Sequence, residues 1–142
     1  MFMLVLLSLV NLFLAGPVAP VKPAKVNLTV DVQNVRKKQG AVYVALYEAG
    51  KPFPDGKPME GKRIDANGSS VKTTFTIEPG DYAVAVYHDE NGNGKMDTRI
   101  FGIPKEPYGF SNNFKPVMSA PKFNDCRFSV GDGGKAISIK LN

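Results

Sequence analysis

The sequence has few of the residues that form the disulfide bonds of small secreted domains or the ligands of zinc centres. Its 142 residues include one cysteine, one histidine and no tryptophan. A single cysteine excludes an internal disulfide framework, and one cysteine with one histidine cannot supply a Cys/His structural zinc site within one chain. Long apolar runs are also scarce: the longest, residues 1–15, is shorter than the ~20 residues that a membrane-spanning helix needs.

The composition favours one turn-rich β domain. Apolar residues make up 43% of the chain, and 14 glycines and 11 prolines occur without a fixed period, which excludes collagen. The formal net charge is +5, but the basic residues are spread out and cluster only at 36–38 and 62–63. We therefore expect a positively charged solvated surface and no nucleic-acid partner.

The amino-terminal segment is typical of an export signal. Residues 1–15 contain no charged side chain, and small residues follow at Ala15, Gly16 and Ala19. These features predict a signal peptide over residues 1–19, a flexible lead-in over 20–25, and a secreted or periplasmic protein with no stable membrane span after cleavage. No lysine or arginine precedes the apolar run, so an uncleaved anchor is the alternative interpretation.

The remaining chain, residues 26–142, shows the alternation of half-buried β-strands. Apolar and polar residues alternate with a period of two, and Gly- or Pro-containing turns separate the segments. The pattern predicts a single all-β domain, an antiparallel, immunoglobulin-like β-sandwich of about seven strands with no helix. Two long connections, 48–69 and 89–121, join these segments. The alternating segments are 26–33, 42–47, 71–77, 82–88, 126–130 and 137–141.

One acidic segment interrupts the basic chain and has the spacing of a calcium loop. Oxygen-bearing side chains occur at Asp89, Asn91, Asn93 and Asp97, and Gly94 permits a sharp turn. The last ligand of the helix-flanked version is absent, because isoleucine stands three residues beyond Asp97. We expect these four side chains to bind Ca²⁺ with modest affinity. A plain solvated turn between strands is the alternative.

The aromatic and amide-rich segment that follows is a candidate binding surface. Tyr108, Phe110, Asn112 and Asn113 would supply apolar anchors and hydrogen-bonding groups, with His88 at the mouth of the acidic loop. The alternative is a packed loop whose rings cover one end of the sandwich.

Three runs of the sequence are distinctive: HDENGNGKMD, GIPKEPYGFSNN and APKFNDCRFSV. Through these runs the chain resembles a family of small exported bacterial proteins known as domain of unknown function 2141. The resemblance covers roughly residues 26–142. It implies an extracytoplasmic location and a transthyretin-like or prealbumin-like β-sandwich, and it implies no activity.

We therefore expect a non-catalytic binding or accessory module with an envelope or extracellular partner and a calcium loop. A purely structural sandwich without a ligand is the second interpretation. A hydrolase-type enzyme that uses His88 is the third, because a lone imidazole beside a carboxylate can activate a nucleophile. We expect Cys126 to be a buried apolar residue on a strand face that it shares with Phe128 and Val130.

Overall fold

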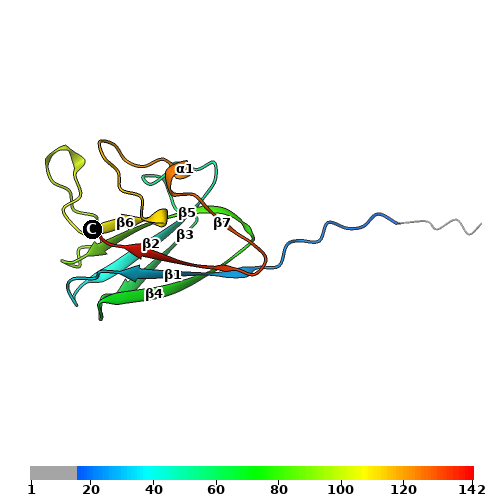
Figure 1. Ribbon diagram of the computed structural model, residues 1–142, viewed down its shortest axis with the longest axis horizontal. Coiled ribbons are helices and arrows are strands. Elements are labelled where there is room, and N and C mark those ends of the chain that lie inside the picture. Colours follow the sequence, from blue (N-terminus) through cyan, green and yellow to red (C-terminus); the bar gives the residue numbers. More distant parts are fainter. Residues whose placement is uncertain (1–15) are drawn as a thin grey trace, which may run out of the picture.

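A computed structural model describes residues 16–142. Residues 1–15, most of the predicted signal peptide, lie outside this range. Residues 16–25, which include the predicted lead-in of residues 20–25, form no regular secondary structure and extend from the domain as exposed chain (Figure 1). Within residues 16–142, no helix is long and apolar enough to cross a membrane.

The domain consists of two packed β-sheets, which confirms the predicted β-sandwich. The first sheet has the strand order β4-β1-β8, with β1 at Val26–Gln33, β4 at Ser70–Ile77 and β8 at Lys135–Lys140. β1 and β4 are antiparallel, whereas β1 and β8 are parallel. The antiparallel prediction is therefore wrong for β1 and β8. These strands lie near opposite ends of the domain sequence, so no tight hairpin forces them to run in opposite directions.

The second sheet has five strands and is antiparallel throughout. Its order is β3-β2-β5-β6, and β7 pairs with β5 beside β6. β6 pairs with residues 85–87 of β5, and β7 pairs with residues 80–82 of the same strand. Two short strands therefore share one edge of a long strand. The strands are β2 (Ala41–Glu48), β3 (Glu60–Asp65), β5 (Gly80–Asp89), β6 (Tyr108–Phe110) and β7 (Phe128–Val130).

Both long connections contain regular secondary structure. β3 lies within 48–69, and β6 and the single-turn helices η1 (Ile100–Gly102) and η2 (Ser111–Asn113) lie within 89–121. A four-residue helix, α1 (Phe123–Cys126), also replaces the start of the strand predicted over 126–130. The described chain thus has eight strands, and the prediction that it has no helix is wrong.

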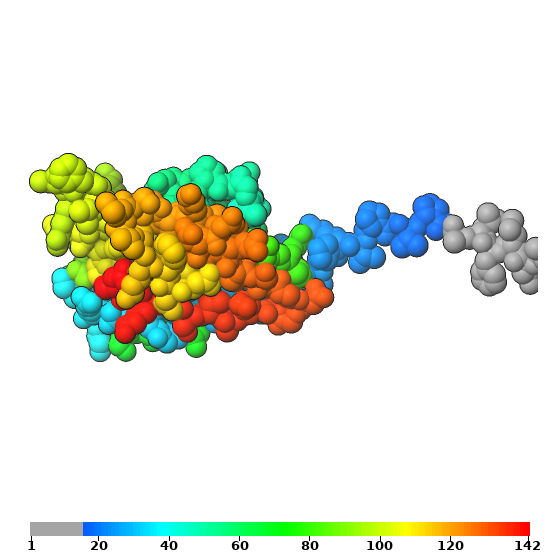
Figure 2. All heavy atoms as spheres, turned by 45° about the horizontal axis from the view of Figure 1, so that its top comes forward, coloured from blue at the N-terminus to red at the C-terminus, as the bar shows by residue number. Residues whose placement is uncertain are grey.

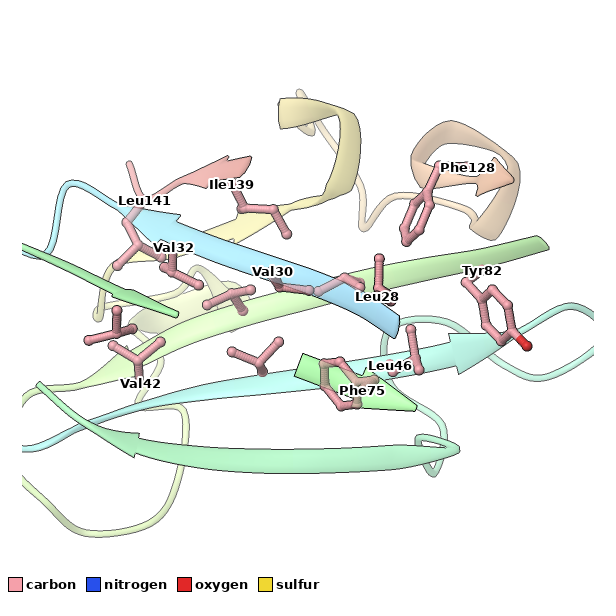
Figure 3. Close-up of a cluster of buried hydrophobic side chains, with 14 of the residues drawn as sticks. Leu28, Val30, Val32, Val42, Leu46, Phe75, Tyr82, Phe128, Ile139 and Leu141 are labelled. Carbon is pink, nitrogen blue, oxygen red and sulfur yellow. The ribbon is translucent and has the colours of Figure 1, made fainter. Parts of the chain in front are cut away.

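Alternating residues from the two sheets form the main core. Leu28, Val30 and Val32 of β1 point toward the face of the second sheet that carries Val42 and Leu46 (Figure 3). All five side chains are fully buried. Burying a side chain of this size contributes roughly 1.5–3 kcal/mol relative to leaving it in water, so the sheet interface dominates stability.

A second, smaller cluster covers the other face of β5. It contains buried Ala83, Phe110 and Cys126, with partly buried aromatic rings such as Phe53 and Phe123 packed against them. Cys126 is buried as predicted, but it lies at the end of α1 and not on a strand. Phe128 belongs to the main core, so the two residues do not share a face.

Candidate functional site

The acidic loop begins where β5 ends, and Asp89 organises it. The Asp89 side chain is 1% exposed. Its Oδ1 accepts hydrogen bonds from the backbone amides of Gly92 (2.8 Å) and Asn93 (3.2 Å), and its Oδ2 accepts one from Gly94 (2.7 Å). Three amides thus converge on one carboxylate, which winds the chain tightly around it.

Two asparagines continue the winding. Asn91 Oδ1 accepts the amide of Asn93 at 3.1 Å, and Asn93 Oδ1 accepts the amide of Lys95 at 2.9 Å. Each contact is an Asx turn, in which a side-chain oxygen binds the backbone two residues on. Gly92 and Gly94 adopt φ values of +72° and +75°, a region that glycine enters without a steric penalty.

The same asparagines hold Asp97. Asn91 Nδ2 donates to Asp97 Oδ2 at 2.6 Å, and Asn93 Nδ2 donates to both carboxylate oxygens at 3.0 Å. These hydrogen bonds lower the pKa of Asp97 below its usual value, because they stabilise the ionised form. The structure therefore brings Asn91, Asn93 and Asp97 together, in one loop with Asp89.

The donor set of this loop suits a hard cation. In residues 16–142, no three His, Cys, Asp or Glu side chains are gathered closely enough to hold a metal. A cation here would therefore need amide oxygens as well as the carboxylates of Asp89 and Asp97. Asp89 uses three of its roughly four lone-pair sites on backbone amides and keeps one. Turning the amide groups of Asn91 and Asn93 would present their oxygens to the Asp97 side of the loop, and it would break the Asx turns that those oxygens form with the amides of Asn93 and Lys95.

Glu106 closes the loop, although no sequence motif predicted it as a site residue. It is 7% exposed. Its Oε1 accepts the amide of Glu90 and its Oε2 accepts the amide of Asp97, both at 3.1 Å. One carboxylate thus ties the beginning of the loop to its end. Two features of the sequence could have found it: Glu106 lies in the distinctive run GIPKEPYGFSNN, and it is the one acidic residue between positions 98 and 124.

His88 lies beneath the loop and not on its surface. It is fully buried on the inner stripe of β5, so its predicted place on a binding surface is wrong. Nε2 lies 2.8 Å from the main-chain oxygen of Gln39 and must donate to it. Nδ1 has no hydrogen-bond partner among the described residues and lies 4.0 Å from Glu90 Oε1.

The turn before β2 braces the loop from the other side. Lys37 Nζ contacts Glu90 Oε2 at 2.7 Å, and Gln39 Nε2 donates to the Glu90 main-chain oxygen at 3.0 Å. Gly40, at φ +68°, packs so closely that a Cβ there would lie 1.9 Å from the Asp89 main-chain oxygen. A polar cavity of about 220 Å³ remains between the turn and the loop, lined by Lys37, Gln39, Glu90, Asn91, Asp97, Lys105 and Glu106.

The comparisons with known proteins place this loop within a family. A family model described as "Uncharacterized protein conserved in bacteria (DUF2141)" matches residues 30–138. The chain belongs to this family. The match contains the whole acidic loop and Glu106, and it confirms the resemblance seen in the sequence. No match was found among the curated proteins or among the solved structures.

In this family member, the five residues predicted as a binding surface have different environments. Phe110 is 8% exposed and Tyr108 packs against it in the smaller core, with ring centroids 5.8 Å apart. Asn112 and Asn113 are exposed but brace the chain: Asn112 donates to the Arg127 main-chain oxygen, and Asn113 accepts the Lys140 amide. The packed-loop interpretation therefore describes the two aromatic rings. Phe110 and Asn113 also line a groove of about 830 Å³ whose basic residues are Arg36, Lys115 and Lys140.

Cys126, the one thiol of the chain, and the hydroxyl of Ser111 are both buried. Burial raises the pKa of the Cys126 thiol to about 12, so it is neutral at ordinary pH. The Ser111 hydroxyl is also buried, where it accepts the Val84 amide at 2.9 Å and donates to the Cys126 main-chain oxygen. This hydroxyl joins η2 to β5 and α1.

Proposed function

We propose that the protein is an exported, non-catalytic β-sandwich module whose loop of residues 89–97 binds Ca²⁺. The loop would then fix the neighbouring loops for a partner in the envelope or outside the cell. The observation that carries this proposal is the convergence of Asn91, Asn93 and Asp97, joined by hydrogen bonds of 2.6–3.0 Å, on the loop that Asp89 organises. Ca²⁺ prefers six to eight hard oxygen ligands, and carboxylate, amide and main-chain oxygens all qualify.

The proposal includes a modest affinity. Asp89 and Asp97 are the two carboxylates of the ligand set, and Asp89 already accepts three amides. Few charged ligands and partial occupation of one of them favour dissociation constants of about 10⁻⁴–10⁻³ M, the range of extracellular calcium modules. Such a site suits a compartment that contains millimolar calcium.

The amino-terminal sequence supports export. Residues 1–15 carry no charged side chain, and an exposed, irregular arm follows at 16–25, which would give a processing enzyme access to the chain. The one thiol, Cys126, is 0% exposed, so an oxidising compartment would not expose it to unwanted disulfide exchange.

A thermal unfolding series in calcium and in EDTA tests the proposal. A ligand present at a hundredfold excess over its dissociation constant stabilises the folded state by about 2.7 kcal/mol, which corresponds to roughly 10 °C in Tm for a domain of this size. Asp97→Asn should remove most of this shift. Asp132→Asn, which removes an exposed carboxylate from the turn between β7 and β8, should leave it unchanged.

An unfolding temperature that is the same in calcium and in EDTA would contradict calcium binding, and would favour a structural sandwich without a ligand. An equal calcium response in Asp97→Asn and in Asp132→Asn would place the cation elsewhere. A magnesium series at the same concentrations is a useful control, because Mg²⁺ demands a smaller and more regular cage of oxygens.

A further inference from the structure

Two loops of the domain expose large apolar side chains to solvent. In the loop of residues 98–104, Ile100 is 78%, Phe101 95% and Ile103 57% exposed. In the loop of residues 114–122, Val117 is 92% and Met118 97% exposed. Contiguous apolar exposure of this kind marks a contact with a protein or with a membrane.

The two loops project from the same edge of the domain. In both Figure 1 and Figure 2 the yellow-green loop and the orange loop stand next to each other, on the side away from β4. The base of the 98–104 loop is closed by the Arg99 amide, which donates to the Ile103 oxygen at 2.7 Å, and by the Lys105 amide, which donates to the Asp97 oxygen at 2.8 Å. The fold thus holds an apolar tip out in solvent on a closed base.

The conformation of Phe101 adds to this point. Its φ is +65°, a region that disfavours residues with a side chain. A phenylalanine that is almost entirely exposed gains nothing from the core in return for this conformation. Its apolar ring is therefore not explained by the stability of the domain.

Basic residues predominate in the segment that carries these tips, between Asp97 on one side and Asp125 on the other. Between positions 98 and 124 the sequence has four basic residues and one acidic residue. The acidic residue, Glu106, is buried and turned toward the amides of the 89–97 loop. The basic residues are all exposed: Arg99, Lys105, Lys115 and Lys122. A surface that combines projecting apolar tips with unneutralised cations is complementary to anionic headgroups above an apolar interior.

We infer that the loops of residues 98–104 and 114–122 form a membrane-docking surface. Ile100, Phe101 and Val117 are among the side chains that enter the interface of a bilayer containing anionic phospholipid, while the flanking lysines and arginine contact the phosphates. The exposed arginine and lysines beside the tips favour a surface of anionic headgroups over a protein partner without negative charge. The inference does not depend on calcium, because the two loops themselves, residues 98–104 and 114–122, contain no acidic residue.

The absence of tryptophan from the sequence gives a direct test. In the full chain, Phe101→Trp places a single tryptophan on the 98–104 loop, and Thr74→Trp places one on the exposed side of β4 as the matched control. Each variant is mixed, in EDTA, with vesicles of phosphatidylcholine alone or of phosphatidylcholine with phosphatidylglycerol. A brominated phosphatidylcholine in the same vesicles quenches a tryptophan that enters the bilayer.

We expect a blue shift and quenching for Phe101→Trp with the anionic vesicles, and neither for Thr74→Trp. Adding Ile100→Ser and Ile103→Ser to Phe101→Trp should weaken binding at least tenfold, and so should adding Arg99→Gln and Lys105→Gln. The result that overturns the inference is a Phe101→Trp emission unchanged by anionic vesicles, or one that changes no more than that of Thr74→Trp. Equal binding to neutral vesicles, or a dimer that Phe101→Ser dissociates in the absence of lipid, would also overturn it.

Discussion

Two consecutive segments of the chain use their side chains in opposite ways. In the loop of residues 89–97, the polar side chains turn inward and bind the loop's own backbone and one another. In the loop of residues 98–104, the apolar side chains turn outward and contact little of the described chain. Only one peptide bond, between Asp97 and Thr98, separates the two segments.

The difference separates stability from recognition. A side chain that accepts hydrogen bonds from buried or closely spaced backbone amides contributes to the free energy of unfolding. Its removal leaves those amides bonded to water or without a hydrogen-bond partner. A side chain that is almost entirely exposed contributes little, and substitutions there are usually within about 0.5 kcal/mol of neutral. Substitutions in the first loop should therefore change unfolding and cation binding, whereas those in the second should change binding to an external surface.

The largest effect is expected from Asp89→Ala. Three backbone amides lose a charged acceptor that is almost completely buried, which should destabilise the domain by about 3 kcal/mol. Urea unfolding with an unchanged m-value measures the loss. Asp97→Ala is the matched variant and should lose far less stability, because the partners of Asp97 are exposed side-chain amides. Equal losses in the two variants would contradict the organising role of Asp89.

Gly40→Ala should have the next largest effect. Alanine at this position would have to adopt a left-handed backbone conformation that disfavours residues with a Cβ, and its Cβ would overlap the Asp89 main-chain oxygen. We therefore expect the free energy of unfolding to fall by about 2–3 kcal/mol. Gly50→Ala separates the two causes. Gly50 has φ +82°, and a Cβ added there would have no atom within 4 Å, so its substitution should lose only about 1 kcal/mol. A calcium response that Gly40→Ala leaves intact would show that the turn does not support the 89–97 loop.

The pH dependence of stability should report on Asp97. Hydrogen bonds from Asn91 and Asn93 lower its pKa in the folded state, so its contribution is fully present above the pKa of the unfolded chain, at about pH 4. The contribution is lost as the pH falls through the lower folded-state value. Urea midpoints between pH 2 and pH 6 should therefore fall more steeply for the native sequence than for Asp97→Asn. Parallel curves would contradict the contacts that hold Asp97.

The smallest effect on stability is expected from Phe101→Gly. Relief of the positive φ and the greater backbone entropy of glycine in the unfolded chain oppose each other, so the unfolding free energy should change by less than about 0.5 kcal/mol. Vesicle binding, measured by co-sedimentation against the native sequence, should nevertheless weaken. A loss of more than about 1 kcal/mol would mean that the Phe101 ring supports the fold, and would remove the contrast between the two loops.

The fold could be predicted where one strand face is apolar and the other polar. Such alternation predicted β1, β2, β4 and β5, and it already placed His88 on the inner stripe of β5 with Val84 and Val86. β3 carries a single apolar residue, Ile64, among polar ones, so its pairing with β2 left no signal in the sequence. The parallel pairing of β1 with β8 depends on how distant segments meet, which periodicity does not encode.

The candidate site shows the same limit. Oxygen-bearing residues two positions apart predicted the 89–97 loop, because a winding chain brings such residues to one side. Glu106 contributes from outside the motif, through contacts with Glu90 and Asp97 that only the folded chain creates. The burial of Phe110 likewise depends on α1 and on Phe53, which approach from other parts of the chain.

A structure from crystals grown in millimolar calcium tests most directly the central claim, that the loop of residues 89–97 binds Ca²⁺. We predict an ion within about 2.3–2.6 Å of oxygens from Asp89, Asn91, Asn93 and Asp97, with both asparagine amides turned so that oxygen faces the ion. An ordered loop without an ion, in which the amide nitrogens of Asn91 and Asn93 still contact the Asp97 carboxylate, would contradict the claim.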